Sequence, residues 1–425
     1  MTLRHKIEHE IREHGPIPFS RYMELCLYDP ELGYYSRTAG QFGKAGDFYT
    51  SSDVHAVFGR LLARQFEEMW RVLGSPASIT LKELGPGRGL FAQDVLDWSQ
   101  KKFPDFFGAL RYLLVERSPA LRGRIEQTLA RHLESGKAEL VPAPEPGSPD
   151  LIATSAAERK QSRANSASRG SGERDDQVPE VGKKPSPTDV TAPKAQTILF
   201  ANEFFDSLPV EILSDQGSLR LDLRDGRLTE TWAPVSPEEL EFLDRYSVHP
   251  EPGERVEVPL IAQEYVYKVA NNLNRGFLIV VDYGYTREEQ LAGRHRGTLK
   301  AIRQHSVSTS PYEAPGEQDI TADVNFSALA AVAREHDMRT QKLLTQSQFL
   351  MGVGEASQFA DAFEDCRLPQ ERAKVALQLK HLVTPAGMGE SFHVLVASKG
   401  VQEESASALS GLSFGRNAPA AGAKT

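Results

Sequence analysis

The sequence has little cysteine, no long apolar run and no excess of basic residues. Its two cysteines, Cys26 and Cys366, lie far apart and match no disulfide or metal-ligand spacing, so we expect neither a disulfide framework nor a metal site. No apolar run approaches the ~20 residues that a membrane span needs, and the N-terminus lacks the apolar stretch of a signal peptide. The net charge of -9 argues against nucleic acid as the main partner, because phosphate binding needs a basic face. These absences together favour a cytoplasmic protein in a reducing compartment.

Aromatic residues are missing from residues 144–196, and this gap divides the chain. The stretch is rich in small, charged and proline residues, and it cannot bury enough apolar surface to offset the entropy lost on ordering. We therefore expect a disordered insertion there. The remaining chain divides into a helical N-terminal region (1–78), two halves of an α/β core (79–143 and 197–400) and a flexible tail (401–425).

Helical periodicity is typical of the N-terminal region. Apolar side chains recur every four residues from Leu3 to Ile11, as they do on one face of a helix. The Gly-Pro-Ile-Pro sequence at 15–18 ends that helix, and Ser20 is predicted to cap the next one. Residues 57–72 form a further amphipathic pattern, so three helices are expected before the core begins.

From residue 79 the pattern changes to alternating strands and helices. This alternation predicts an α/β fold with a Rossmann-like, mostly parallel sheet and right-handed crossovers. Residues 209–233, with glycine at their turns, predict an antiparallel meander inserted beside the site. The core strands are expected at 79–84, 111–116, 138–141, 197–202 and 276–284, with a terminal antiparallel pair at 338–344 and 391–398.

A glycine-rich loop at 83–89 lies where the first core strand ends and a helix begins. Gly85, Gly87 and Gly89 let the chain turn tightly and let a ligand approach the backbone. A dinucleotide loop reads GxGxxG and favours a pyrophosphate, whereas here the third glycine comes one residue early. The GxGxG form led by Glu83 suits S-adenosylmethionine, a cofactor without phosphate. An ordinary tight turn is the structural alternative.

Polar side chains lie at the ends of three of the four later core strands, at the edge where open α/β sheets bind ligands. Glu116 ends one strand and could accept both hydroxyls of a ribose, as expected for S-adenosylmethionine or for NAD. Asn202 is a second candidate for the cofactor. Glu203, Asp206 and Asp282 are candidate catalytic residues, although acids early in a helix also complement its dipole.

A further loop, at residues 43–53, combines glycines with hydroxyl and acidic groups. Gly46, Asp47 and Thr50 could fold over the cofactor, while neighbouring residues cap the following helix. The polar segment 316–324 is interpreted as the capped start of a helix.

Together these motifs resemble the MidA family of class I methyltransferases, which includes a mitochondrial complex I assembly factor with protein arginine methyltransferase activity. The resemblance extends over most of the chain, and only the 144–196 insertion departs from it. The matching segments, in family order, are GDFYTS (46–51), ELGPGRG (83–89), VERSP (115–119), ANEFFDSLPV (201–210), VDYG (281–284) and DITADVNF (319–326).

The resemblance implies a seven-stranded class I fold, S-adenosylmethionine as methyl donor and a protein arginine as acceptor. The mitochondrial relative further implies a respiratory complex I-type subunit as the protein substrate. An arginine must lose a proton during transfer, and paired carboxylates such as Glu203 and Asp206 could bind and orient its guanidinium. Three alternatives stay open: a cofactor-binding assembly factor or chaperone for a respiratory complex, a small-molecule methyltransferase, and an NAD(P) oxidoreductase. The sequence does not fix the oligomeric state.

Overall fold

The structure, a computed structural model, describes most of the chain. The described residues are 2–37, 56–142, 196–293, 296–303, 306–308 and 310–414. The predicted cofactor residues Gly46, Asp47 and Thr50 lie outside these ranges, as does nearly all of the 144–196 insertion. Within the described ranges, no helix combines the length and apolar character needed to cross a membrane.

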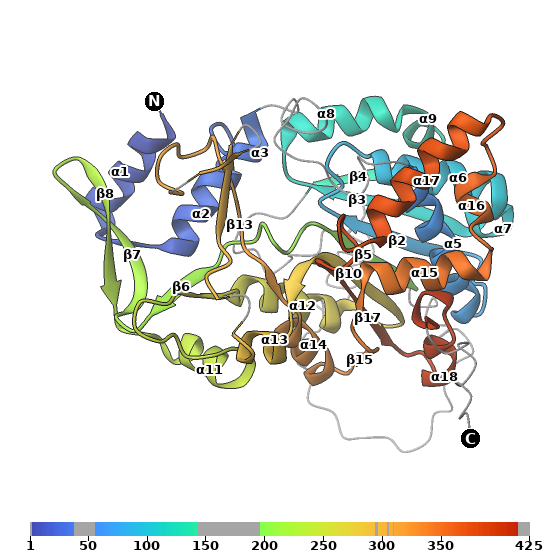
Figure 1. The fold of residues 1–425 in the computed structure, drawn as a ribbon. Coiled ribbons are helices and arrows are strands. Elements are labelled where there is room, and N and C mark those ends of the chain that lie inside the picture. Colours follow the sequence, from blue (N-terminus) through green and yellow to red (C-terminus); the bar gives the residue numbers. More distant parts are fainter. Residues whose placement is uncertain are drawn as a thin grey trace, which may run out of the picture.

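A central, mostly parallel sheet forms the core (Figure 1). Its strands run in the order β15-β17-β10-β5-β2-β3-β4, and only the pairings made by β17 along this path are antiparallel. The predicted α/β class and the predicted terminal antiparallel pairing are confirmed. The strands are β2 (Ile79–Leu84), β3 (Leu110–Glu116), β4 (Ala138–Pro142), β5 (Thr197–Asn202), β10 (Gly276–Tyr285), β15 (Arg339–Thr340) and β17 (Phe392–Lys399), with β14 (Val324–Asn325) beside β10 and β16 (Leu344–Thr345) beside β17.

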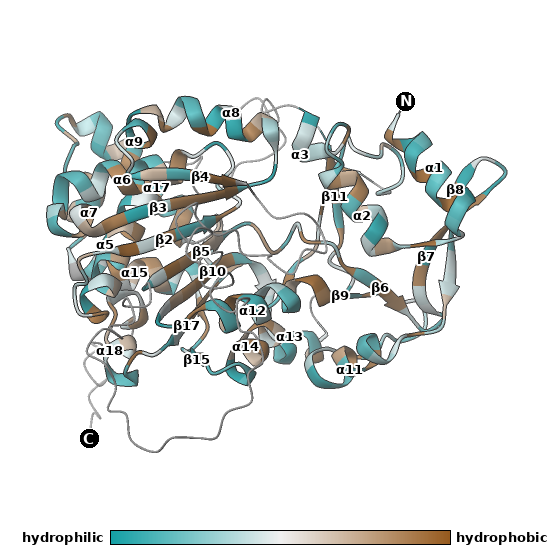
Figure 2. Cartoon of the chain, turned by 180° about the vertical axis from the view of Figure 1, so that it is seen from behind, coloured by the Kyte–Doolittle hydropathy of each residue, from teal (hydrophilic) through white to brown (hydrophobic). Residues whose placement is uncertain are grey.

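Both faces of this sheet are covered by helices, because alternate strand residues are apolar on both sides (Figure 2). One face, with Leu81, Leu114 and Phe200, packs against α5 (Val57–Val72), α6 (Leu90–Lys102), α7 (Pro104–Ala109), α8 (Pro119–Thr128), α15 (Gln346–Ala356) and α17 (Pro369–Val383). The other face, with Leu113 and Val280, packs against α12 (Leu260–Asn272) and α14 (Phe326–Glu335). The helix predicted at 57–72 has these bounds in the structure.

A second lobe is built around the accessory strands. Helices α1 (Leu3–His14) and α2 (Phe19–Tyr28) pack on a sheet of order β1-β7-β6-β9, with β8 paired to β7. The predicted meander corresponds to the middle of this sheet, which also recruits the chain before α2 and the strand before α12. Its strands are β1 (Ile17–Pro18), β6 (Glu211–Ser214), β7 (Gly217–Arg224), β8 (Arg227–Ala233) and β9 (Val256–Val258). Within region 1–78, α1 and α2 thus pack on the accessory sheet, whereas α5 covers the core sheet.

The remaining short elements connect these two lobes. A small antiparallel sheet, β12-β11-β13, leads from the accessory lobe back to the core. The elements are α3 (Tyr34–Arg37), α9 (Ala130–Glu134), α11 (Pro237–Tyr246), α13 (Arg287–Leu291), β11 (Lys300–Arg303), β12 (Ser306–Val307) and β13 (Asp319–Thr321).

The predicted cap of the second helix is wrong, because the residue that precedes this helix is Pro18 and not Ser20. Helix α2 begins at Phe19, after the extended residue Pro18, so Ser20 already lies inside the helix. Its hydroxyl donates to the carboxylate of Glu211 on β6 instead. The Ser20 hydroxyl, which was expected to cap the helix, therefore binds Glu211 of the accessory sheet. The sequence around Ser20 gives no sign of this partner, because Glu211 is distant in the chain.

Residues 401–414, expected to begin a flexible tail, form ordered structure in the core. Helix α18 (Glu403–Ser407) and a 3-10 turn at Ser410–Leu412 pack their apolar side chains against α5 and α15. Two polar side chains of α5 accept backbone hydrogen bonds from this segment, Glu68 from Ser410 at 2.9 Å and Gln65 from Gly411 at 2.9 Å. The small residues that suggested a tail fit instead into close packing.

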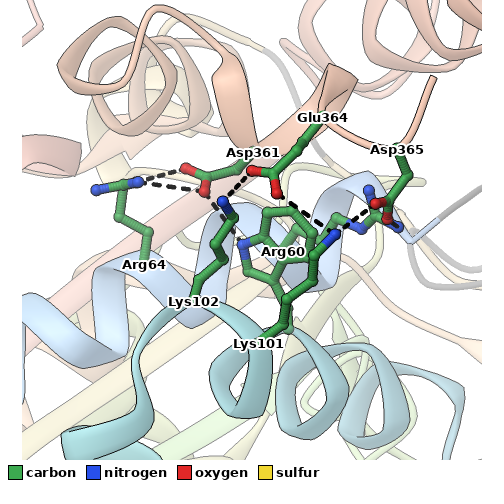
Figure 3. A network of polar contacts seen from close by, with 8 residues as sticks. Arg60, Arg64, Lys101, Lys102, Asp361, Glu364 and Asp365 are labelled. Atoms are coloured by element: carbon green, nitrogen blue, oxygen red, sulfur yellow. Dashed lines mark hydrogen bonds and ion pairs between the residues drawn. The ribbon is translucent and has the colours of Figure 1, made fainter. Parts of the chain in front are cut away.

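A network of opposite charges joins α5, α6 and α16 (Ala360–Phe363), as Figure 3 shows. The buried carboxylate of Asp361 accepts hydrogen bonds from Arg64 Nε at 2.5 Å and from the indole of Trp98 at 3.1 Å. The guanidinium of Arg60 lies 4.4 Å above the ring of Trp98. The remaining members are two lysines of α6, Lys101 and Lys102, and two acids after α16, Glu364 and Asp365, and each of these acids pairs with a cation.

Candidate active site

The glycine loop between β2 and α6 has the left-handed backbone that its glycines permit. Gly85 and Gly87 have φ of 63° and 54°. A Cβ built on Gly85 would lie 2.9 Å from Cδ2 of Phe204, so the turn after β5 packs directly on the loop. A Cβ built on Gly87 meets no atom of the described residues within 4 Å, so among these residues its backbone leaves room for a ligand. Gly89 then precedes the first residue of helix α6, Leu90.

Two buried carboxylates lie behind this loop, on neighbouring strands. Glu83, at the end of β2, accepts a hydrogen bond from the hydroxyl of Tyr112 at 2.7 Å, and burial raises its pKa to about 8. Glu116, at the end of β3, accepts from the backbone N–H of Ser118 at 2.8 Å. Burial raises the pKa of Glu116 to about 7, against the effect of this donor. Ser118 caps α8.

Asp282, on β10, holds the turn that follows β5. One oxygen of its fully buried carboxylate accepts the backbone N–H groups of Phe204, Phe205 and Asp206 at 3.1, 2.9 and 3.3 Å, and the other accepts that of Tyr283 at 2.9 Å. Burial and nearby carboxylates raise the pKa of Asp282, while the backbone donors lower it. This geometry favours a positioning role for Asp282, which holds the backbone of the turn, in place of the catalytic role expected from the sequence.

The same turn carries the other two candidate catalytic residues. Glu203 has a φ of 50°, an uncommon conformation for a residue with a side chain, and its N–H donates to Val281 at 3.0 Å. Asn202 Nδ2 donates to the Glu203 carboxylate at 3.1 Å. Strain of this kind persists where the surroundings fix it, and here β10 and Asp282 hold the turn in place. Glu203 and Asp206 are each half-buried.

Asp206 extends this turn toward acids from the second lobe that sequence reasoning missed. Its carbonyl accepts the N–H of Ala322 at 2.9 Å, which brings the 319–323 segment to the site. Burial and the negative charge of Asp323 raise the pKa of Asp206 to about 7. Asp323 pairs with Lys300 at 3.0 Å. The segment was interpreted only as a capped helix start, and Asn325 does cap α14.

A buried acid and two tyrosines complete this side of the site. The hydroxyl of Tyr35 donates to Asp319 at 2.7 Å, and the backbone carbonyl of Tyr35 accepts the hydroxyl of Ser118 beside Glu116. The hydroxyl of Tyr28 donates to the carbonyl of Ser207 at 2.9 Å. The N-terminal helices thus contact both the cofactor edge and the acidic turn. We call Glu203, Asp206, Asp319 and Asp323 the carboxylate cluster.

A model of S-adenosyl-L-methionine-dependent methyltransferases matches residues 61–344, about two thirds of the chain. This chain belongs to that family. S-adenosylmethionine is therefore its cofactor, and the dinucleotide alternative is set aside. The matched range contains every described candidate residue on the four core strands.

Curated relatives and solved structures extend the similarity along the chain. The mitochondrial protein arginine methyltransferase NDUFAF7 homolog of Drosophila melanogaster is 27% identical, over 94% of this chain and 85% of the relative. The human NDUFAF7 protein is 28% identical, over 92% and 82%. A Burkholderia thailandensis structure with bound S-adenosyl-homocysteine has a TM-score of 0.71 at 24% identity, covering 96% of this chain and 94% of that one. A native structure from the same organism gives 0.71 at 25%.

These relatives correct one expectation. A cytoplasmic protein was predicted from the sequence, but the curated relatives are named as mitochondrial proteins, so this prediction is wrong. The error has a physical reason. Unpaired cysteines indicate a reducing environment, and they do not distinguish one reducing compartment from another.

The polar groups at the sheet edge fit the cofactor of this family. The buried Oδ1 of Asn202 has no hydrogen-bond donor among the described residues, so it can accept an N–H from a ligand. Among the described residues, the backbone of Gly87 leaves room for a ligand, and Glu116 lies directly behind it. Glu83, Gly85, Gly87, Gly89, Glu116 and Asn202, all predicted cofactor residues, gather at this one edge of β2, β3 and β5. Their individual roles stay predictions.

Proposed function

We propose that this methyltransferase transfers the methyl group to the guanidinium of an arginine side chain in a protein. The observation that carries the proposal is the carboxylate cluster beside the glycine loop. A guanidinium is a planar cation with five N–H donors, and carboxylates match its geometry in pairs. The curated relatives named as protein arginine methyltransferases support the same acceptor.

The proposed chemistry needs a proton acceptor as well as binding groups. The cofactor, when bound, supplies an electrophilic methyl group on a sulfonium. The guanidinium nitrogen must lose a proton as it takes the methyl group, and an acceptor with a pKa near neutrality is best suited to this. Asp206 has a pKa of about 7 because of burial and Asp323. We assign it proton transfer, Glu203 orientation of the guanidinium, and Asp282 positioning of the turn that carries both.

The protein that bears the arginine is a separate question. The family resemblance extends the proposal to a respiratory complex I-type subunit as the substrate. The curated relatives that are named as protein arginine methyltransferases support a protein as the acceptor.

Product analysis tests the proposed acceptor. The purified protein is incubated with methyl-tritiated S-adenosylmethionine and a mitochondrial protein extract, and the protein fraction is hydrolysed to amino acids. We expect tritium in methylated arginine. Label in small molecules, or in methylated lysine or glutamine alone, would contradict the proposal.

Replacement of Glu203 by glutamine separates acceptor binding from cofactor binding. The amide keeps the size of the side chain but removes the charge that attracts a guanidinium, so we expect turnover to fall by about tenfold or more with little change in S-adenosyl-homocysteine affinity. Calorimetric titration and methyl-transfer rates measure the two quantities. The exposed Glu238→Gln variant, on α11, is the matched control. Equal losses of both would assign Glu203 to the cofactor site instead.

A further inference from the structure

Tyr112 lies on β3 below the glycine loop, and no ligand-binding role follows from its position in the sequence. It shares a face of the sheet with Glu83, because Leu81 pairs with Tyr112 and Glu83 pairs with Leu114 in the parallel register. The hydroxyl of Tyr112 donates to Glu83 Oε2 at 2.7 Å, and both side chains are buried. A charge-assisted hydrogen bond of this kind fixes both the direction and the charge of a carboxylate.

The buried phenol is suited to this task. Burial and the Glu83 carboxylate raise the pKa of Tyr112 well above its ordinary value, so the hydroxyl keeps its proton and remains a donor. Tyr112 is also rigid, because it is fully buried in the core between the sheet and its helices. A phenylalanine at this position would keep the ring and lose only the donor.

We propose that Tyr112 is a positioning residue of the cofactor site, whose hydroxyl orients Glu83 and favours the ionised form that binds the cationic amino group of the cofactor. This inference rests on the proposed cofactor role of Glu83 and is independent of which acceptor is methylated. It makes cofactor binding release a proton whenever Glu83 is protonated beforehand. Cofactor affinity is then expected to rise with pH.

The groups that face Glu83 define the expected pH range. Two described side chains shift the pKa of Glu83, and both lie on β3: Tyr112 lowers this pKa and Glu116 raises it. Phe200, which pairs with Glu83 from β5, carries no charge. With a pKa of about 8, Glu83 is mostly protonated at pH 7 in the free protein, so affinity should increase up to about pH 8 and then level off.

The test is the affinity for S-adenosyl-homocysteine, measured by calorimetry between pH 6.5 and about 9.5 on the full chain. For Tyr112→Phe, loss of the donor raises the pKa of Glu83 further, so relative to the unaltered protein at the same pH we expect about tenfold weaker binding at pH 7 and a much smaller difference at the high end. Comparison at equal pH removes the titration of the ligand's own amino group. Tyr22→Phe is the matched control, because the buried Tyr22 donates to the carbonyl of Pro311 in the second lobe. It should leave both affinity and pH profile unchanged.

Two results would overturn the inference. A Tyr112→Phe variant that binds as tightly as the unaltered protein at pH 7 would exclude a positioning role, and one weakened by the same factor at every pH would indicate structural damage only. Glu83→Gln keeps the tyrosine and tests the same idea if Tyr112→Phe does not fold. We expect it to bind weakly with no rise between pH 7 and about 8.5, and a retained rise would assign the proton to another group. Neither result would affect the arginine proposal, which product analysis tests separately.

Discussion

Charged side chains are arranged in opposite ways in two regions of the molecule. In the network of α5, α6 and α16, each acid that is drawn pairs with a cation, and Asp361 has both Arg64 and Trp98 as donors (Figure 3). In the carboxylate cluster, acids lie beside one another: Asp206 is close enough to Asp323 for the two charges to interact, and Lys300 pairs with Asp323. The first arrangement stabilises the fold. The second costs folding free energy and is expected to recover it when a cationic acceptor binds.

The pKa values of acids in the two regions shift in opposite directions, because cations neighbour the acids of the network, whereas burial dominates in the site. Lys101 and Arg60 lower the pKa of Asp365, whereas burial and the charge of Asp323 raise that of Asp206, and burial alone raises that of Glu116. Raised acid pKa values in a family of transferases are typical of sites that bind or move protons. The direction of the pKa shift therefore distinguishes acids that stabilise the fold from acids expected to act in the site. Variants in each of the two regions can test this distinction.

Breaking the paired network should have the largest effect on stability. Asp361→Ala removes a buried acid and leaves Arg64 and the indole of Trp98 without their acceptor, so we expect a loss of about 3–5 kcal/mol in unfolding free energy. Methyl transfer per folded molecule should not change. Urea unfolding measures the first quantity, with half-exposed Glu364→Gln as control at about 1 kcal/mol or less. An Asp361→Ala loss no larger than the control would refute the structural role.

The buried acids of the site should change the unfolding free energy in a pH-dependent way, and by less than the loss expected for Asp361→Ala. Glu116 has a folded pKa of about 7 against an ordinary 4.5, so the folded protein holds this proton more tightly than the unfolded chain does. Its stabilising contribution is present below pH 4.5 and is lost as the pH rises through 7. Glu116→Gln, which cannot ionise, should thus gain up to about 3 kcal/mol relative to the unaltered protein between about pH 4.5 and 8.

Urea unfolding at several pH values checks this sign. The control is Asp365→Asn in the paired network, where the pKa of the acid is lowered. Its difference from the unaltered protein should shrink as the pH falls below about 4, the opposite trend. A Glu116→Gln difference that is constant with pH would show that Glu116 is ionised in the folded protein throughout.

The cofactor edge could be predicted from sequence because its signals are local. The β2 strand, the glycine loop and helix α6 follow one another within about twenty residues, and the loop spacing alone limits what can bind. Glu116, Asn202 and Asp282 became candidates because each lies at or near the end of a core strand, and parallel strands bring their carboxyl ends to one edge. Residues that are far apart in the sequence are therefore expected to meet at one edge of the sheet.

The other half of the site could not be predicted in the same way. The bond from Tyr35 to Asp319 joins residues 284 positions apart, and it forms because the accessory lobe folds back over the sheet edge. Locally, the 319–325 segment has the signature of a helix cap, and Asn325 does cap α14. The role of Asp282 was also hidden, because the backbone N–H groups that it binds belong to a turn 76–78 positions earlier.

The most direct test of the account is a paired measurement on Asp206→Asn. Methyl incorporation into extract proteins and urea unfolding are measured on the same preparation, with S-adenosyl-homocysteine affinity as a third quantity. We predict that transfer falls by about 10²–10⁴-fold, that cofactor affinity is unchanged and that unfolding free energy is equal or higher, because a repelling charge is removed. Retained transfer, or a loss of stability that accounts for the lost activity, would contradict the assignment of the carboxylate cluster as the acceptor site.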